Sequence, residues 1–243
     1  MYKNVAFEKA TAFAKSYAYP KGEEKAGAGL VRPAITISRM TGAGGHVIAS
    51  ELAEYMQAHV PTHEPWTVYD QNLVEKVLED HNLDKRIAED MSEEHKSMLA
   101  DILEALIRKH PSAWTLVEHT NATIVRLATL GNVIIVGRGG VVITAKLGNV
   151  FHVRLVASLE KRVEYGMRVY GVDRKAALDF IKKRDEGRRR YLKDYFDADV
   201  DNPLLYHMII NTDLVPYNEA VEMIGDAVIK HFGLGQAVKA AGH

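Results

Sequence analysis

The stretch Pro33–Met56, PAITISRMTGAGGHVIASELAEYM, limits the fold more than any other part of this sequence. It begins with a short apolar run, continues through a turn rich in glycine, and ends in a helical pattern with Ile48, Leu52 and Met56 on one face. Such a turn between a strand and a helix points backbone N–H groups and the positive helix end at one place. The stretch therefore predicts an α/β domain with a phosphate-binding loop, and a plain tight turn is the alternative.

The loop lacks two side chains of the full phosphate-binding pattern G-x-x-x-x-G-K-[ST]. If Gly44 is taken as the second glycine, Arg39 stands at the first glycine and Gly45 at the lysine. His46 follows where Ser or Thr is expected, and Thr41 either lends a hydroxyl to a metal or phosphate or only shapes the turn. Arg39 is the only cation in the loop, so it is the candidate for the missing charge, with a surface arginine at a strand end as the alternative.

The remaining sequence predicts a doubly wound sheet, because apolar runs alternate with helical patterns. The predicted parallel strands are Ala34–Ser38, Thr67–Tyr69, Asn132–Val136, Val150–Val156 and His207–Asn211. The predicted helices of the core are His46–Gln57, Asn72–Asp80, Glu93–His110, Ala113–Leu130, Leu159–Tyr170, Arg174–Phe196 and Asn218–Phe232.

Polar residues follow several of these strands, and ligands of open α/β sheets bind beyond the carboxyl ends of the strands. Asp70 follows the second run and is either a metal or substrate ligand or a helix N-cap. Arg138 stands between glycines after the third run, where its guanidinium can hold a phosphate with two parallel bonds. Asn211 and Thr212 end the last run and either contact a base or form a turn.

Charged residues cluster once, in KKRDEGRRRYLK at Lys182–Lys193. Arg184 and Arg188 are four residues apart and therefore share one face of a helix, next to Asp185. Arginines on one face suit phosphoryl transfer, which depends on positioning and on neutralising charge. The cluster predicts a clamp for a transferring phosphoryl group, and a solvated helix face is the alternative.

Composition excludes several classes of protein. The 243 residues include 31 Lys plus Arg against 32 Asp plus Glu, which argues against a dedicated nucleic-acid binder. The sequence has no cysteine, no His-Glu-x-x-His spacing and no apolar run long enough to span a membrane. Charges interrupt the apolar part of the N-terminal segment, so it is not a secretory signal. We expect a cytoplasmic protein with neither a membrane partner nor a dedicated metal site.

Six segments in one order, over roughly residues 34–228, together resemble the cytidylate kinase-like family, a branch of the nucleoside monophosphate kinases. They are ITISRMTGAGGHVIASELA, WTVYDQNLVEKVL, NVIIVGRGG, FHVRLVASLEKRVE, DEGRRRYLKDYF and YHMIINTD. The resemblance implies a P-loop fold with a five-stranded parallel sheet flanked by helices, a helical insertion and a mobile lid. It also implies transfer of the ATP γ-phosphate, with Mg²⁺, to CMP or a related small acceptor.

The resemblance, together with the reading of the loop and the strand ends above, assigns roles to residues. The phosphates of the donor nucleotide would be held by Thr41, Gly42, Ala43, Gly44, Gly45 and His46. The base of the donor would lie near Asn211 and Thr212. Asp70, Lys76, Arg138 and Asp185 would bind the acceptor, and Arg39, Arg184 and Arg188 would serve catalysis. Val156 stands where cytidylate kinases usually carry an Asp near the cytosine, so the acceptor stays open.

The expected organisation is an N-terminal helix and connector at residues 1–29, a kinase-like domain at 30–235 and a tail at 236–243. The insertion is expected at about 72–130 and the lid at about 171–197. The N-terminal helix would lie across the core or against a second subunit, so a homo-oligomer is left open. Two other hypotheses remain: a nucleotide-binding sensor without turnover, and a kinase for a non-nucleotide acceptor.

Overall fold

The structure is a computed structural model that describes residues 31–60, 62, 64–70 and 115–234. Lys76, the predicted N-terminal helix and the helices predicted at 72–80 and 93–110 lie outside these ranges. Within them, no helix is both long and apolar enough to cross a membrane.

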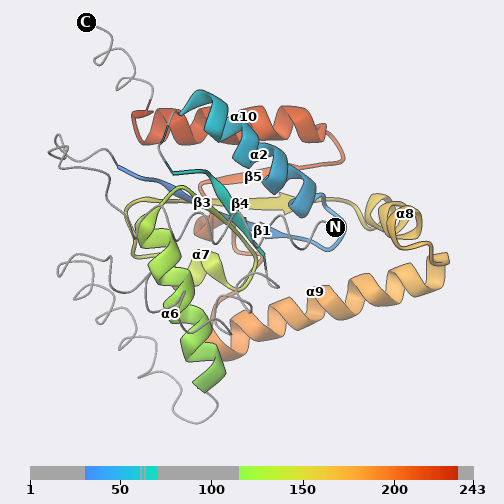
Figure 1. The fold of residues 1–243 in the computed structure, drawn as a ribbon. Coiled ribbons are helices and arrows are strands. Elements are labelled where there is room, and N and C mark those ends of the chain that lie inside the picture. Colours follow the sequence, from blue (N-terminus) through green and yellow to red (C-terminus); the bar gives the residue numbers. More distant parts are fainter. Residues whose placement is uncertain (1–30, 61, 63, 71–114, 235–243) are drawn as a thin grey trace, which may run out of the picture.

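Five parallel strands form the centre of the molecule (Figure 1). They are β1 (Ala34–Arg39), β2 (Thr67–Tyr69), β3 (Val133–Val136), β4 (Val150–Val156) and β5 (Met208–Asn211). Their order is β2-β3-β1-β4-β5, so the chain winds first to one side of β1 and then to the other. The predicted doubly wound sheet is thereby confirmed, and its switch point, where ligands bind in such folds, lies at the carboxyl end of β1.

Helices cover both faces of the sheet (Figure 1). The helices are α2 (Gly45–His59), α6 (Thr115–Leu130), α7 (Gly140–Ile143), α8 (Leu159–Tyr170), α9 (Arg174–Phe196) and α10 (Tyr217–His231), with a 3₁₀ turn at Pro203–Leu205. On one face, α2 and α10 bury Ile48, Leu52 and Ile224 against Ile35 and Ile37 of β1. On the other face, α6 and α7 form a second apolar cluster against β1 and β3.

The elements observed differ from those predicted mainly at their ends. β3 begins at Val133 rather than Asn132, because Asn132 has a left-handed φ of 53°. β1 continues to Arg39, which pairs with Leu155 of β4. α7 follows Arg138 directly and was not predicted, since its four residues are too few to show a helical period.

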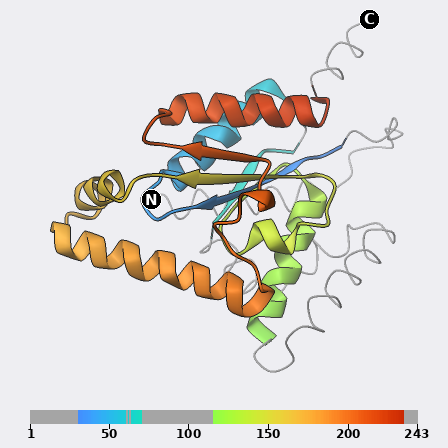
Figure 2. The ribbon, with the colours of Figure 1, turned by 180° about the vertical axis from the view of Figure 1, so that it is seen from behind.

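Helix α9 is a long helix beside the sheet (Figure 2), and its buried residues lie towards its two ends. Near its start, Ala177 and Ile181 pack against Val163 of α8. Near its end, Leu192 and Phe196 are buried in the apolar clusters of the core. The charged stretch between these contacts crosses the carboxyl end of the sheet, and the arginines predicted to form a clamp therefore face the switch point.

Candidate functional site

The glycine loop between β1 and α2 is shaped by two residues with positive φ. Gly42 has φ 88° and Gly44 has φ 81°, values that only glycine adopts without strain. A Cβ on Gly42 would lie 3.0 Å from the Cβ of Arg162, so α8 packs directly against the loop. A Cβ on Gly44 would overlap the ring of Tyr217 at the start of α10. The loop is therefore fixed from both sides, and both positions exclude a larger residue.

The side chain of Arg39 crosses the loop through space left by two glycines. A Cβ on Gly45 would lie 2.8 Å from Arg39 Cγ, and a Cβ on Gly137 would overlap its guanidinium group. Gly45 is the residue that stands where the phosphate-binding pattern has its lysine. The stem of Arg39 therefore lies beside the lysine position, and its guanidinium group extends to the end of β3.

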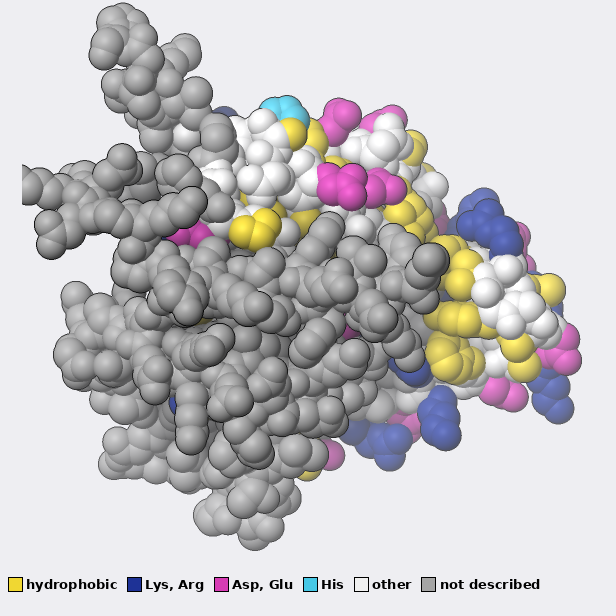
Figure 3. Space-filling model, viewed as in Figure 1, with side chains coloured by type: hydrophobic (Ala, Val, Ile, Leu, Met, Phe, Trp, Pro, Cys, Tyr) yellow, Lys and Arg dark blue, Asp and Glu magenta, His cyan; other side chains and the backbone are white. Residues whose placement is uncertain are grey.

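Four arginines meet in one pocket at the carboxyl ends of β1 and β3. Arg39, Arg138, Arg184 and Arg188 line a cavity of about 360 Å³, which we call the four-arginine pocket. Thr36, Ser38, Tyr191, Leu192 and Val200 complete part of its wall. Lys and Arg side chains also gather on the surface along the side where α9 runs (Figure 3). The pocket unites the three arginines predicted to serve catalysis with the one predicted to bind the acceptor.

The electrostatics of the four-arginine pocket favour an anion. Burial, together with Arg188 and Arg184, lowers the pKa of Arg39 to about 10. A shift in this direction means that the positive charge of Arg39 is destabilised by its surroundings. A bound phosphate would relieve the repulsion among these guanidinium groups, so the pocket has the properties of a phosphate site.

Arg138 has a left-handed backbone, with φ 55° between Gly137 and Gly139. Such a conformation costs a non-glycine residue on the order of 1 kcal/mol and persists where its surroundings enforce it. The turn continues directly into α7 through a hydrogen bond of 3.0 Å from Gly140 N–H to Gly137 O. The strained turn sets the direction of the Arg138 side chain into the pocket, as its place between glycines had suggested.

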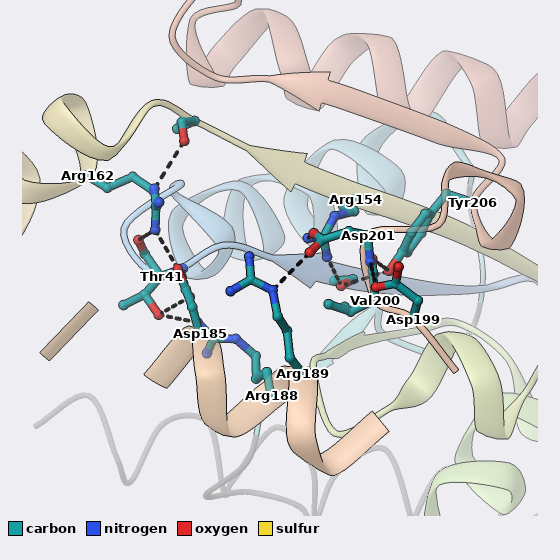
Figure 4. Close-up of polar contacts among 12 residues, drawn as sticks. Thr41, Arg154, Arg162, Asp185, Arg188, Arg189, Asp199, Val200, Asp201 and Tyr206 are labelled. Atoms are coloured by element: carbon teal, nitrogen blue, oxygen red, sulfur yellow. Dashed lines mark hydrogen bonds and ion pairs between the residues drawn. The ribbon is translucent and has the colours of Figure 1, made fainter. Parts of the chain in front are cut away.

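Asp185 joins helix α9 to the glycine loop (Figure 4). Its Oδ1 accepts hydrogen bonds from the backbone N–H of Thr41 at 2.9 Å, the Thr41 hydroxyl at 2.7 Å and Arg188 at 2.5 Å. Its Oδ2 accepts a bond of 2.6 Å from Arg162. Burial alone would raise the pKa of Asp185, but the hydrogen bonds from Thr41 and Arg188 outweigh burial and lower it. The structure thus places this carboxylate at the loop and outside the lining of the four-arginine pocket.

A second ionic network connects Arg189 of α9 to the sheet (Figure 4). Arg154 of β4 is 5% exposed, pairs with Asp201 and donates a hydrogen bond of 3.1 Å to Ser38. Asp201 also accepts a bond of 2.9 Å from Arg189 of α9. Neither Arg154 nor Arg162 was predicted as a site residue. The sequence offered one signal for Arg154, an arginine inside the apolar run FHVRLVAS, and none for Arg162.

The other predicted residues lie around the loop. Asp70 is 4.0 Å from the exposed His46 and close enough to Arg39 to act against the lowering of its pKa. Thr212 hydrogen-bonds the backbone oxygens of Val156, at 3.3 Å, and Ala43, at 3.5 Å, which ties β5 to the loop.

Asn211 accepts a bond of 3.0 Å from Asp213 N–H, as a turn-forming residue does. Among the described residues, no group of three or more His, Asp or Glu side chains is arranged to hold a metal ion.

Comparisons with known proteins place the chain in a family. The model of the cytidylate kinase-like family matches residues 34–214. A solved structure of an uncharacterized protein from Eubacterium ventriosum ATCC 27560 has a TM-score of 0.62 at 22% identity, covers 82% of this chain and 99% of that chain, and shares the fold. Shikimate kinase from Bacteroides thetaiotaomicron has a TM-score of 0.44 at 14% identity, with 82% of this chain and 97% of that chain covered. No curated protein matches. On the match over residues 34–214, the chain belongs to the cytidylate kinase-like family.

Proposed function

We propose that the protein is a phosphotransferase that moves the γ-phosphate of ATP to CMP or a related small acceptor. One observation carries the proposal: four arginines from β1, the turn after β3 and α9 meet beside a glycine loop at the switch point of the sheet. Phosphoryl transfer needs positioning and electrostatic neutralisation more than covalent catalysis, and arginines supply both. Membership of the cytidylate kinase-like family supports a kinase-like activity.

The glycine loop would hold the donor. The segment from Thr41 to His46, which runs through Gly42, Ala43, Gly44 and Gly45 into the start of α2, would surround its phosphates with backbone N–H groups. In the structure as it stands, the N–H of Ala43 bonds Met40 O and the N–H of Thr41 bonds Asp185. Asn211 ends β5 and Thr212 follows it, and both would contact the base of the donor. Mg²⁺ would arrive as the ATP·Mg²⁺ complex, in which phosphates and water supply most of its ligands.

Arg39 would supply the charge that the P-loop lysine gives elsewhere. Its stem passes Gly45 and its guanidinium group lies at Gly137, next to the turn that carries Arg138. This position lies between the glycine loop and the expected acceptor site, where a transferring phosphoryl group would be. The planar fork of arginine cannot reproduce the point charge of lysine, so we expect slower transfer than a P-loop lysine would give.

The acceptor would bind on the side of Arg138, with Asp70 and Lys76 contributing. Arg184 and Arg188 would close over it from α9 and neutralise charge during transfer. In this proposal the kinase-like domain spans residues 30–235, with α9 in its lid at about 171–197, and the protein works in the cytoplasm on small molecules.

A nucleotide sensor with little or no turnover is the second candidate. Gly45 in place of the lysine favours it, as does the bond of 2.9 Å from the loop N–H of Thr41 to Asp185. The two candidates agree on nucleotide binding and differ only in transfer.

The test is an assay with ATP labelled in the γ-phosphate, Mg²⁺ and a panel of CMP, dCMP, UMP and AMP. We expect label in at least one acceptor and a loss of roughly 10² or more in rate for Arg188→Ala. Arg190→Ala is the matched control, because Arg190 is exposed on the same helix and absent from the pocket lining. Binding of ATP without label in any acceptor would favour the sensor.

A further inference from the structure

The carboxylate of Asp185 lies among hydrogen-bond donors that suit a phosphate. Thr41 contributes its backbone N–H and its hydroxyl, and Arg162 and Arg188 contribute guanidinium groups. We call these donors the Thr41 cradle. It is separate from the four-arginine pocket and shares only Arg188 with it.

The Thr41 cradle keeps part of its geometry through contacts that do not involve Asp185. Arg162 is 8% exposed, and its Nε donates a bond of 3.1 Å to the backbone oxygen of Ala157. Its Nη1 lies 3.3 Å from the backbone oxygen of Thr41, and its Cβ packs on Gly42. A buried guanidinium group oriented by backbone oxygens is a fixed site for an anion.

We infer that the Thr41 cradle binds a phosphate group of the donor triphosphate, with Arg162 as a ligand, and that Asp185 occupies it until the donor arrives. This inference rests on the proposed function, because it assigns the donor side of the same site. Asp185 accepts bonds from the four donors with two oxygens, and a terminal phosphate offers three oxygens to the same donors.

Asp185 is able to leave the cradle because of its place on α9. The apolar contacts of this helix lie at Ala177 and Ile181 on one side and at Leu192 and Phe196 on the other. Asp185 stands between them, and the hydrogen bonds between α9 and Thr41 of the loop are made by the polar side chains of Asp185 and Arg188. Two anions close together repel each other, so a phosphate in the cradle displaces the carboxylate. The exchange replaces Asp185 with the phosphate as the partner of Arg188, which also lines the four-arginine pocket.

The test uses inorganic tripolyphosphate and ATP, each titrated by calorimetry into the full-length protein without an acceptor. Asp185→Asn removes the internal anion and should tighten binding of both ligands about tenfold, whereas Arg162→Gln should weaken it about tenfold. Arg168→Gln is the matched control, because Arg168 is exposed on the same helix and outside the cradle. Equal affinities of Asp185→Asn and the native chain would overturn the inference, as would equal affinities of Arg162→Gln and the native chain.

Tripolyphosphate has no base and needs no acceptor, so this result is independent of phosphoryl transfer. If the cradle variants behave as expected while no acceptor is labelled, the inference stands and the transferase proposal fails.

A second measurement uses the native chain and does not depend on the folding of a variant. Aspartate labelled with ¹³C reports the carboxyl group of Asp185 by NMR during a pH titration. When tripolyphosphate binds, the carboxylate loses its hydrogen bonds from Thr41, and its pKa should rise towards the ordinary value for Asp. A bound ligand that leaves the Asp185 resonance and its titration unchanged would contradict the exchange.

Discussion

Arg39 and Gly45 occupy one space in the glycine loop: a Cβ on Gly45 would lie 2.8 Å from Arg39 Cγ. The residue that replaces the P-loop lysine is thus the residue that makes room for the arginine. The two positions depend on each other, so a substitution at one changes the geometry of the other.

We expect Gly45→Ala to weaken binding of ATP·Mg²⁺ about tenfold, because the new methyl group displaces the stem of Arg39. Arg39→Ala removes the same interaction, so the double variant should bind no more weakly than Arg39→Ala alone. Gly148→Ala is the control, since a Cβ there meets nothing within 4 Å. Calorimetry on the native chain, the two single variants and the double variant measures the coupling between the two positions. Additive losses of binding free energy would show that the two positions act independently.

Arg138→Ala should weaken binding of an acceptor monophosphate more than binding of ATP. Arg138 follows β3 and lines the four-arginine pocket, where the acceptor is proposed to bind. The loss of one charge-assisted, two-pronged contact corresponds to roughly 1.5 to 3 kcal/mol, or about ten- to a hundredfold in affinity. Titrations of both ligands into Arg138→Ala, with Lys146→Ala as an exposed control, decide the matter. An equal loss for the two ligands would remove Arg138 from the acceptor site.

Asp201→Ala should destabilise the fold, because Arg154 is 5% exposed and would lose its carboxylate. A buried cation without its partner costs about 2 kcal/mol or more. Arg189→Ala removes only the exposed partner of the same carboxylate and should cost below about 1 kcal/mol. Chemical denaturation of the two variants gives both free energies of unfolding. Equal, small losses would mean that Asp201 does not stabilise the buried Arg154.

The free energy of unfolding should decrease as the pH is lowered from about 7 to 4, because of His152. Burial lowers the pKa of His152 from 6.5 to about 4, with a smaller contribution from His207, and its Nδ1 is 2.7 Å from Thr36 Oγ1. The unfolded chain therefore binds a proton more readily than the folded chain between these values. Stability is full above about pH 7 and declines towards pH 4, by at most about 3 kcal/mol from this group.

Unfolding by urea at several pH values measures how the free energy of unfolding changes with pH. We expect this change to be smaller in His152→Gln. If the free energy of unfolding changed equally with pH in the native chain and in His152→Gln, the pH dependence would come from other groups.

The sequence predicted the parts of the site that depend on local pattern. The five strands and the turn at Gly42 to Gly45 follow from short apolar runs and from glycine spacing. Arg184 and Arg188 were placed on one face by helical spacing, and both line the pocket. These features need only neighbouring residues, which is why one sequence was enough.

The parts that were not predicted depend on contacts between distant segments. Arg162 meets the backbone of Thr41, 121 residues away, and nothing near either residue announces that contact. The absence of the P-loop lysine at Gly45 was visible, but the passage of Arg39 through the vacated space required coordinates. Asp185 was assigned to the acceptor by family resemblance; the structure adds its bonds to the loop.

The central claim is that Arg39 supplies the charge of the missing P-loop lysine. Its most direct test is the single-turnover rate of phosphoryl transfer from ATP·Mg²⁺ in Arg39→Ala relative to the native chain. The assay uses the acceptor to which the native chain transfers phosphate fastest, and circular dichroism verifies that the variant is folded. Removal of one preorganised charge donor predicts a rate lower by about 10² to 10³. Transfer by a folded Arg39→Ala protein at the native rate would contradict the claim.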